Sequence, residues 1–235
     1  MSPWSYLLNM PSPMPKFIPF QAQNLSAEES LKKALELEAL MEKRRSIRLF
    51  SERPVAKELV QSLVRTASSA PSGAHKQPWT FCIIADPKIK QQIRQAAEKE
   101  EYESYNNRMS EEWLAALKPF GTNWEKPFLE RAPYLIVIFK KSYDILPDGS
   151  RSKNYYVNES VGLAAGFLIS AIHQAGLVTL THTPSPMNFL QEILQRPKNE
   201  KPFLLLPIGY AAEGCEVPDL RRKSLDEVAL YWEAD

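Results

Sequence analysis

The stretch "YLIVIFK" (residues 134–140) decides the fold class, because its apolar residues are consecutive rather than alternating. A strand with this pattern is buried on both faces of its sheet. Three further apolar runs have similar character: "TFCIIAD" (80–86), "LVTLT" (177–181) and "FLLLPIGY" (203–210). Segments with helical spacing separate these runs, so we predict a sheet covered by helices on both faces.

The predicted helices cover residues 26–43, 54–70, 87–108, 154–175 and 186–195. The first opens on the capping box Ser26-Ala-Glu-Glu29, and the fourth is closed by Gly176. We expect "KSYDILPDGSRSK" (141–153) to be a loop, and "VPDLRRKSLDEVALYW" (217–232) to be a basic turn followed by an amphipathic tail.

The composition indicates one globular domain without a dominant charge. The chain has 235 residues, is 44% hydrophobic and has a formal net charge of +1. Such a chain buries a full core, and no global field attracts it to nucleic acid or to a membrane surface. Cys82 and Cys215 have no metal-ligand spacing and do not suggest a disulfide framework, which favours a reducing, cytoplasmic location.

Residues 1–25 contain Pro3, Pro11, Pro13, Pro15 and Pro19 and are predicted to form an extended arm. A disordered tail fits the composition equally well. Neither a signal peptide nor an amino-terminal anchor is expected. Residues 161–181 approach the length of a membrane span, but His173, Gln174 and Gly176 favour a buried helix followed by a strand.

Several common chemical motifs are absent from the sequence. It contains no G-x-G-x-x-G, no G-x-x-x-x-G-K-[ST], no H-E-x-x-H and no G-x-S-x-G. His75, His173 and His182 are too scattered to suggest a metal site. Any chemistry is therefore expected to come from a bound cofactor that needs no glycine-rich loop.

The most basic stretch is "MEKRRSIRLF" (41–50), where Arg44, Arg45 and Arg48 surround Ser46. Arginine forks match phosphate oxygens, and the hydroxyl adds a further hydrogen bond. By itself the run fits a solvated helix end better than a phosphate site, since basic runs are usually solvated and cations there oppose the helix dipole. A second stretch, "RTASSAPSGAHKQPWTF" (65–81), places a tight turn between a helix and a strand.

Together the two stretches, R-R-S-x-R followed by A-P-S-G-x-x-x-x-P-W, resemble the flavin-dependent nitroreductase superfamily. The resemblance implies an α+β, three-layer fold with a central mixed β-sheet flanked by helices, assembled as a homodimer with the flavin at the subunit interface. Gly162 and Gly166 are spaced for close helix packing, which is weak support in itself.

Within that superfamily the chain is most similar to the iodotyrosine deiodinase family. The stretches that carry this likeness are "NRMSEEW", "TNWEKPFLERAP", "HQAGLVTLTHTP" and "GYAAEGCEVPDLRRKSLDE", and it extends from about Leu31 to Val228. Its most specific part is an insertion at about residues 98–126, which we name the lid segment. The implied domain organisation is the arm over residues 1–25 and one FMN-dependent domain over residues 26–235.

The resemblance implies FMN as cofactor, with contacts from Arg44, Arg45, Ser46, Arg48, Pro71, Ser72, Thr181, His182, Thr183 and Arg222. Thr183 matches a threonine whose hydroxyl bonds flavin N5, which makes it the implied catalytic residue and favours one-electron flavin chemistry. His182 stands where a threonine is more familiar, so only its backbone contact is implied. Without the resemblance, Thr181 and Thr183 fit ordinary strand-end residues.

The implied substrate is a halotyrosine, bound by Ala74, Glu101, Tyr105 and Lys126. Glu101 and Tyr105 lie four residues apart, on one face of a helix. A carboxylate suits the ammonium of an amino acid, and a lysine with a phenol suits its carboxylate. The backbone N–H of Ala74 is implied to hold the phenolate. Charge alone would not separate Glu101 from a solvated helix face that includes Glu98, Glu100 and Glu103.

The implied reaction is reductive dehalogenation, with electrons from an external NAD(P)H-derived reductant or reductase and closure of the lid segment over the substrate. Two alternatives remain at this stage. One is a nitro- or quinone-reductase that uses the same FMN site with a less selective pocket. The other is a flavin- or halotyrosine-binding protein without useful turnover.

Overall fold

A computed structural model of the chain describes residues 16–232 and divides the chain into two compact units, one ending at Leu40 and the other beginning at Met41. In the first unit, residues 16–25 form neither helix nor strand and are exposed. The remainder of the predicted arm, residues 1–15, lies outside the described residues. The predicted boundary after residue 25 stays a prediction.

Helix α1 (Ala27–Glu42) begins at the predicted capping box. The Ser26 hydroxyl accepts from the Glu29 N–H at 3.1 Å, and the Glu29 carboxylate accepts from the Ser26 N–H at 2.8 Å. The two bonds satisfy backbone donors that a helix start otherwise leaves free.

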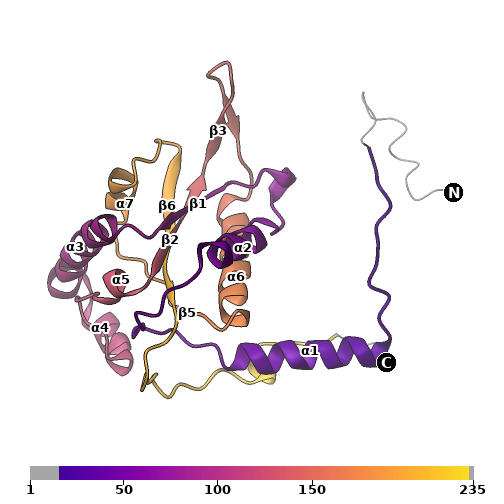
Figure 1. Ribbon diagram of the computed structural model, residues 1–235, viewed down its shortest axis with the longest axis horizontal. Coiled ribbons are helices and arrows are strands. Elements are labelled where there is room, and N and C mark those ends of the chain that lie inside the picture. The colour runs from indigo at the N-terminus through magenta and orange to yellow at the C-terminus, as the bar shows by residue number, and fades with distance from the viewer. Residues whose placement is uncertain (1–15, 233–235) are drawn as a thin grey trace. The chain divides into compact units, whose positions relative to one another are not determined.

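The second unit contains the remaining elements (Figure 1). Its helices are α2 (Lys57–Ser68), α3 (Pro87–Glu103), α4 (Glu111–Leu117), α5 (Phe128–Arg131), α6 (Val157–Gln174) and α7 (Asn188–Ile193). Short helical turns are η2 (Gly73–His75), the π-helical η3 (Ser104–Arg108), η4 (Lys118–Phe120) and η5 (Leu225–Glu227). The strands are β1 (Trp79–Ile84), β2 (Tyr134–Lys141), β3 (Tyr143–Ile145), β4 (Arg151–Lys153), β5 (Val178–Thr179) and β6 (Glu200–Gly209).

The main sheet has the strand order β1-β2-β6-β5, and neighbouring strands in it pair antiparallel. Isolated bridges extend it, including a parallel bridge between Ser46 and Thr179 and an antiparallel one between His182 and Leu205. The parallel bridge makes the sheet mixed, as predicted. It also attaches the basic stretch 43–48 to the edge of the sheet.

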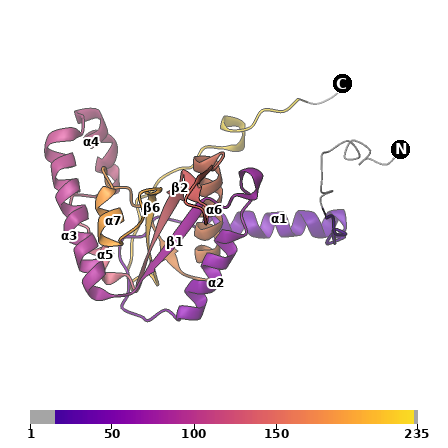
Figure 2. The same ribbon diagram turned by 90° about the horizontal axis from the view of Figure 1, so that it is seen from above.

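Strand β2 is buried on both faces, which confirms the prediction made from its apolar run. Ile136 and Ile138 belong to one hydrophobic cluster, with residues of α2 and α6. Leu135, Val137 and Phe139 belong to another, with residues of α3, α5 and α7. Figure 2 shows the resulting three layers, with α3, α5 and α7 on one side of the strands and α2 and α6 on the other. The fold is α+β, as predicted.

The prediction of a loop over residues 141–153 was wrong, because β3 and β4 form an antiparallel hairpin there. Gly149 in the connecting turn has φ of 81°, a left-handed conformation that glycine adopts without strain. The strand expected over 177–181 is regular only at Val178 and Thr179. The predicted amphipathic tail forms just the short turn η5, and its large apolar side chains are exposed.

Candidate functional site

The basic stretch is held against the sheet by its apolar members. The Ile47 N–H donates to the Thr179 carbonyl at 3.1 Å, and Phe50 bridges Ala211. Ile47 and Phe50 are buried, whereas Arg44, Arg45 and Arg48 are half-buried. This alternation turns a basic run into one wall of a pocket.

That pocket, which we name the basic pocket, has a volume of about 260 Å³. Its lining residues are Arg44, Arg45, Ser46, Arg48, Phe120, Val217, Pro218, Leu220, Arg221 and Arg222. The pKa of Arg44 is lowered by burial and by the nearby charges of Arg222 and Arg45. Within residues 16–232, Arg44, Arg45 and Arg48 form no ion pair. Such unmatched positive charge suits a phosphate group.

Arg222 reaches the basic pocket from the carboxy-terminal segment. Its guanidinium donates to the carbonyls of Glu42 at 2.9 Å and Arg44 at 2.8 Å. The Glu42 carboxylate lies 3.2 Å from the same guanidinium. Arg45 in turn donates to the carbonyl of Pro218. These contacts bring together cations that are far apart in the sequence, as the predicted site requires.

A second pocket, about 240 Å³ in volume, contains both signs of charge, and we name it the mixed-charge pocket. Its lining residues are Arg48, Glu101, Tyr105, Met109, Trp113, Leu117, Thr122, Lys126, Phe128, Leu180, Thr181, His182 and Thr183. Arg48 lines both pockets. The structure therefore gathers the predicted substrate-binding side chains of the lid segment beside the predicted Thr181–Thr183 segment.

Glu101 and Lys126 face each other within the mixed-charge pocket. The Lys126 Nζ lies 3.5 Å from Glu101 Oε2, and the two side chains are only 5% and 12% exposed. Lys126 also donates to the Asn123 carbonyl. Burial raises the pKa of Glu101 and lowers that of Lys126, although their mutual attraction opposes both shifts. Desolvation thus outweighs pairing, and each charge can accept a better partner.

Tyr105 and His182 complete the polar lining. The Lys126 Nζ lies 5.4 Å from the centroid of the Tyr105 ring, and burial raises the pKa of the Tyr105 hydroxyl. The His182 ring meets Phe128 edge to face, with centroids 5.7 Å apart. Burial lowers the pKa of His182 to about 3, with Lys126 and Arg48 adding to the shift, so the imidazole is neutral near pH 7.

The turn with Pro71, Ser72 and Ala74 lies elsewhere in the chain. The Gly73 N–H donates to the Ser160 hydroxyl at 3.2 Å, beside the start of α6. A Cβ at Gly73 would lie 2.8 Å from the Tyr155 carbonyl oxygen, so this turn is tightly packed there. Ala74 adopts φ of 50°. The structure does not bring these three predicted residues to either pocket.

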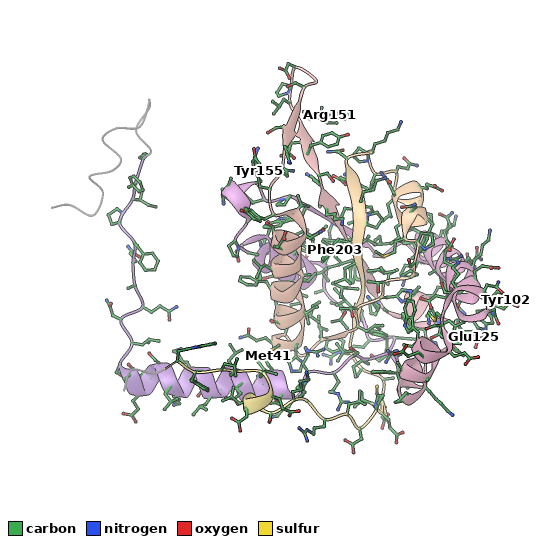
Figure 3. All side chains as sticks on the ribbon, turned by 180° about the vertical axis from the view of Figure 1, so that it is seen from behind. Met41, Tyr102, Glu125, Arg151, Tyr155 and Phe203 are labelled. Atoms are coloured by element: carbon green, nitrogen blue, oxygen red, sulfur yellow. The ribbon has the colours of Figure 1, made fainter. Side chains whose placement is uncertain are left out.

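The separation follows from the length of α6. Arg44 and Arg45 line a neighbouring cavity with Ile172, near the end of this helix. From Ser160 to Ile172 an α-helix rises about 18 Å. Figure 3 shows Tyr155 and Met41, which precedes the arginines, at opposite ends of α6. The turn also contacts the start of α6, whereas α3, the helix of Glu101, lies on the other side of the sheet from α6 (Figure 2).

Some lining residues were missed by the sequence reasoning. Met109, which precedes α4, and Trp113 and Leu117 within it line the mixed-charge pocket, and Arg221 lines the basic pocket beside Arg222. The apolar residues of "SEEWLAAL" lie three to four apart, a spacing that gives a short helix one apolar face. That spacing was the sequence signal that could have identified Trp113 and Leu117. For Arg221, the only such signal was its position next to Arg222.

Two kinds of feature are absent from the described residues. No helix within residues 16–232 is long and apolar enough to cross a membrane. In the same range, His, Cys, Asp and Glu side chains form no group of three or more that could hold a metal ion.

Comparison with known proteins gives consistent matches. Residues 41–210 match the nitroreductase family model. The chain is 66% identical to an iodotyrosine deiodinase of Haliscomenobacter hydrossis over 218 residues, which cover 93% of this chain and 98% of that relative. It is 42% identical to the human iodotyrosine deiodinase 1, over 91% of this chain and 74% of the relative.

A crystal structure of oxidized iodotyrosine deiodinase bound to FMN and 3-iodo-L-tyrosine is similar to this fold, with a TM-score of 0.71 and 30% sequence identity. The match covers 85% of this chain and all of that one. A nitroreductase of Bacteroides fragilis, 17% identical with a TM-score of 0.62, shares the fold. With its fold, its two pockets and these matches, the chain belongs to the nitroreductase family and, within it, to the iodotyrosine deiodinases.

Proposed function

We propose that this protein is an FMN-dependent reductive dehalogenase that converts a halotyrosine to tyrosine and halide. The observation that carries the proposal is the position of Arg48, which lines both the basic pocket and the mixed-charge pocket. A phosphate-bearing cofactor and an amino-acid zwitterion would therefore lie side by side. The relatives described above support this choice of cofactor and substrate.

The basic pocket would hold the FMN phosphate. Arg44, Arg45, Arg48 and Arg222 supply charge-assisted donors, and the exposed Ser46 hydroxyl supplies one more. The flavin ring would extend toward Thr181–Thr183, with the Thr183 hydroxyl as the partner of flavin N5. When bound, FMN supplies the electrons of the reaction and is reduced again by an external NAD(P)H-derived donor.

The mixed-charge pocket would hold the zwitterion by exchanging ion pairs. The substrate ammonium takes the place of the Lys126 ammonium, which lies 3.5 Å from the Glu101 carboxylate in this structure. Lys126 and the Tyr105 hydroxyl then bind the substrate carboxylate. The carbon–halogen bond breaks and a carbon–hydrogen bond forms, which consumes two electrons and one proton and releases halide.

A second copy of the chain would complete the site. The turn with Pro71, Ser72 and Ala74 adjoins the Ser160 end of α6 and Arg44 and Arg45 adjoin the Ile172 end, about 18 Å along the helix, so we assign the two groups of one FMN site to different chains. In a homodimer, the turn of one copy would face the arginines of the other. The exposed α6 side chains Leu163 and Phe167, beside Gly162 and Gly166, suit an interface between copies.

The function is tested by incubating the FMN-loaded protein with dithionite and 3-iodotyrosine. We expect stoichiometric release of iodide and tyrosine, and much slower turnover of 2-iodophenol, which lacks the zwitterion. A matched assay with a nitroarene and a quinone measures the competing activity. Faster turnover of these two than of iodotyrosine would favour a general reductase, and iodotyrosine binding without iodide release would indicate a binding protein.

The shared site is tested by combining two defective chains. Arg48→Glu places a negative charge in the basic pocket, and Gly73→Val displaces the turn from Tyr155. Neither variant should hold FMN by itself. A mixed dimer with one chain of each kind would contain one intact site, so purification through two different tags should yield one FMN per two chains. Absence of FMN from the mixed dimer would place the whole site within one chain.

We also propose a cytoplasmic location, since Cys82 and Cys215 are both free. Fractionation of the source cells with an antibody against the protein tests it.

A further inference from the structure

The two carboxylate oxygens of Glu101 face different partners. Oε2 lies 3.5 Å from the Lys126 ammonium, and Oε1 lies 4.0 Å from Nδ1 of His182. In the proposed function the substrate ammonium displaces Lys126 from Oε2. The other oxygen remains directed at His182, a residue for which the family resemblance implies only a backbone contact.

The surroundings of His182 indicate which ring nitrogen carries the proton. The side chain is 6% exposed, and its Nε2 is buried without a hydrogen-bond partner among the described residues. A proton on Nε2 would leave a buried donor unpaired and would turn the lone pair of Nδ1 toward the Glu101 carboxylate. A proton on Nδ1 instead points at the Glu101 carboxylate. Since burial and the nearby Lys126 and Arg48 keep the pKa low, the ring is a neutral donor.

His182 is also rigidly supported. Its backbone N–H donates to the Leu205 carbonyl at 2.9 Å and its carbonyl accepts from the Leu205 N–H at 3.1 Å. Leu205 lies within the buried strand β6. The ring packs against Phe128 of α5. A donor fixed to the sheet in this way can hold a carboxylate of the lid segment at a defined place.

The lid segment meets the same stretch of chain at a second point. Arg108 donates to the Ser185 carbonyl at 2.7 Å, and the Ser104 hydroxyl donates to it at 3.4 Å. Ser104 and Arg108 belong to η3, which directly follows the helix of Glu101. The lid segment therefore approaches residues 182–185 at two points: Glu101 lies near His182, and Ser104 and Arg108 bond to Ser185. Thr183 lies between these two points.

We propose that His182 is a positioning residue that donates from Nδ1 to Glu101 and so directs the carboxylate to the ammonium of the substrate. The 4.0 Å separation shortens to hydrogen-bond length when the lid segment closes. A neutral donor suits this task, because it fixes the carboxylate without cancelling the charge that the ammonium needs. The inference rests on the proposed function for its substrate, but the contact with the lid segment does not.

The test compares His182→Phe with His182→Asn in the FMN-loaded protein. Phenylalanine keeps a ring against Phe128 but has no donor, whereas the asparagine Nδ2 retains a donor near the position of Nδ1. One measurement is hydrogen–deuterium exchange of residues 98–126 without substrate. The other is flavin-fluorescence titration with 3-iodotyrosine and with 2-iodophenol.

We expect His182→Phe to speed exchange in the lid segment and to weaken 3-iodotyrosine binding, each about tenfold, while 2-iodophenol binding stays within twofold. His182→Asn should remain close to the wild type in all three measurements. In a Glu101→Gln background, His182→Phe should add less than a twofold loss, because both variants remove the same interaction.

Equal effects of the two His182 variants, or a full additional loss in the Glu101→Gln background, would overturn the proposal. If the wild type does not prefer 3-iodotyrosine to 2-iodophenol, the proposed function fails instead. Exchange in the lid segment then decides the role of His182 without reference to substrate.

Discussion

The basic pocket and the mixed-charge pocket share Arg48 but differ in how their charges are paired. In the basic pocket, Arg44, Arg45 and Arg48 form no ion pair in the described part of the chain, and the nearby charges of Arg222 and Arg45 lower the pKa of Arg44. In the mixed-charge pocket, Glu101 and Lys126 pair with each other. An unmatched cluster suits a dianion that stays bound, whereas a paired one suits a ligand that enters and leaves in each turnover.

The difference has an energetic reason. In the basic pocket, Arg45 and Arg222 repel Arg44, so a bound phosphate gains both its own contacts and the relief of that repulsion. In the mixed-charge pocket, Glu101 and Lys126 partly satisfy each other's buried charge. A bound zwitterion would replace the Glu101–Lys126 ion pair with two new pairs, one with Glu101 and one with Lys126. The free energy lost with the original pair limits the affinity for the zwitterion.

The largest effect is expected where the two pockets meet. Arg48→Ala removes a charge-assisted contact worth about 1.5–3 kcal/mol, so FMN should bind about 10- to 150-fold more weakly. Arg222→Ala should give a loss of the same order, although its guanidinium also contacts the Glu42 and Arg44 carbonyls. Titration of the apoprotein with FMN, followed by flavin fluorescence, measures both.

Arg65→Ala is the matched control, since Arg65 is an exposed cation on α2 outside both pockets. Its FMN affinity should equal that of the wild type. Should Arg48→Ala and Arg222→Ala behave like this control, the basic stretch would be an ordinary solvated helix end.

The next largest effect is expected at Glu101, the carboxylate of the ion pair in the mixed-charge pocket. Glu101→Gln keeps the shape of the side chain but removes the charge that faces the substrate ammonium, at a cost of about 1–3 kcal/mol. Binding of 3-iodotyrosine should weaken about tenfold or more, and binding of 2-iodophenol should barely change. Flavin-fluorescence titrations with the two ligands provide the measurement.

Glu112→Gln in α4 is a suitable control, because Glu112 is an exposed carboxylate of the same lid segment and does not line the pocket. Equal losses for both ligands with Glu101→Gln would show that this carboxylate does not recognise the zwitterion.

The sequence predicted the layers better than it predicted the site, for a physical reason. The run at 134–140 contains its own evidence for burial on both faces, since strand neighbours alternate between faces. The hairpin at 141–153 was missed because its strands are short and half exposed, although the Asp-Gly pair in its turn was visible.

The site depends on contacts that no local pattern contains. The spacing of Glu101 and Tyr105 places them on one helix face, and the structure brings both to one pocket, as expected. The approach of His182 to Glu101 depends on the pairing of His182 with Leu205 and on how α3 packs on the sheet. The distance of Ala74 from the pockets depends on the length of α6, which no motif encodes.

A smaller effect concerns the neutral ring at the border of the mixed-charge pocket. The pKa of His182 is about 3, below the usual 6.5, so this group stabilises the folded protein above pH 6.5 and the contribution is lost as the pH falls toward 3. The pKa of Glu101 is raised, so its effect on stability is the opposite: its contribution is present at low pH and is lost as the pH rises. Lys126, Arg48 and Tyr105 are the other charged or titratable side chains that line this pocket.

His182→Asn separates the two contributions, because it removes one titration and keeps Glu101. Between pH 7.5 and pH 5.5 the free energy of unfolding of the wild type should fall by about 1.4 kcal/mol more than that of the variant. Urea unfolding at the two pH values, on FMN-loaded protein, measures the difference. Parallel pH dependences would mean that the imidazole is protonated in the folded state and is not a neutral donor.

The smallest effect is expected at Thr183, where the difference between the pockets is one of chemistry rather than of charge. Its side chain lines the mixed-charge pocket and carries no charge, so Thr183→Ala should leave the affinities for FMN and for 3-iodotyrosine within about twofold. If its hydroxyl is the partner of flavin N5, the variant should lose one neutral hydrogen bond, worth about 0.5–1.5 kcal/mol. The ratio of dehalogenation to nitroreduction should then fall about 2- to 10-fold, as measured with 3-iodotyrosine and a nitroarene under the same reductant. Thr181→Ala, two residues away in the same pocket wall, serves as the control and should keep the wild-type ratio. A ratio that falls equally in both variants would assign the effect to the shape of the segment, because only the Thr183 hydroxyl is proposed to pair with flavin N5.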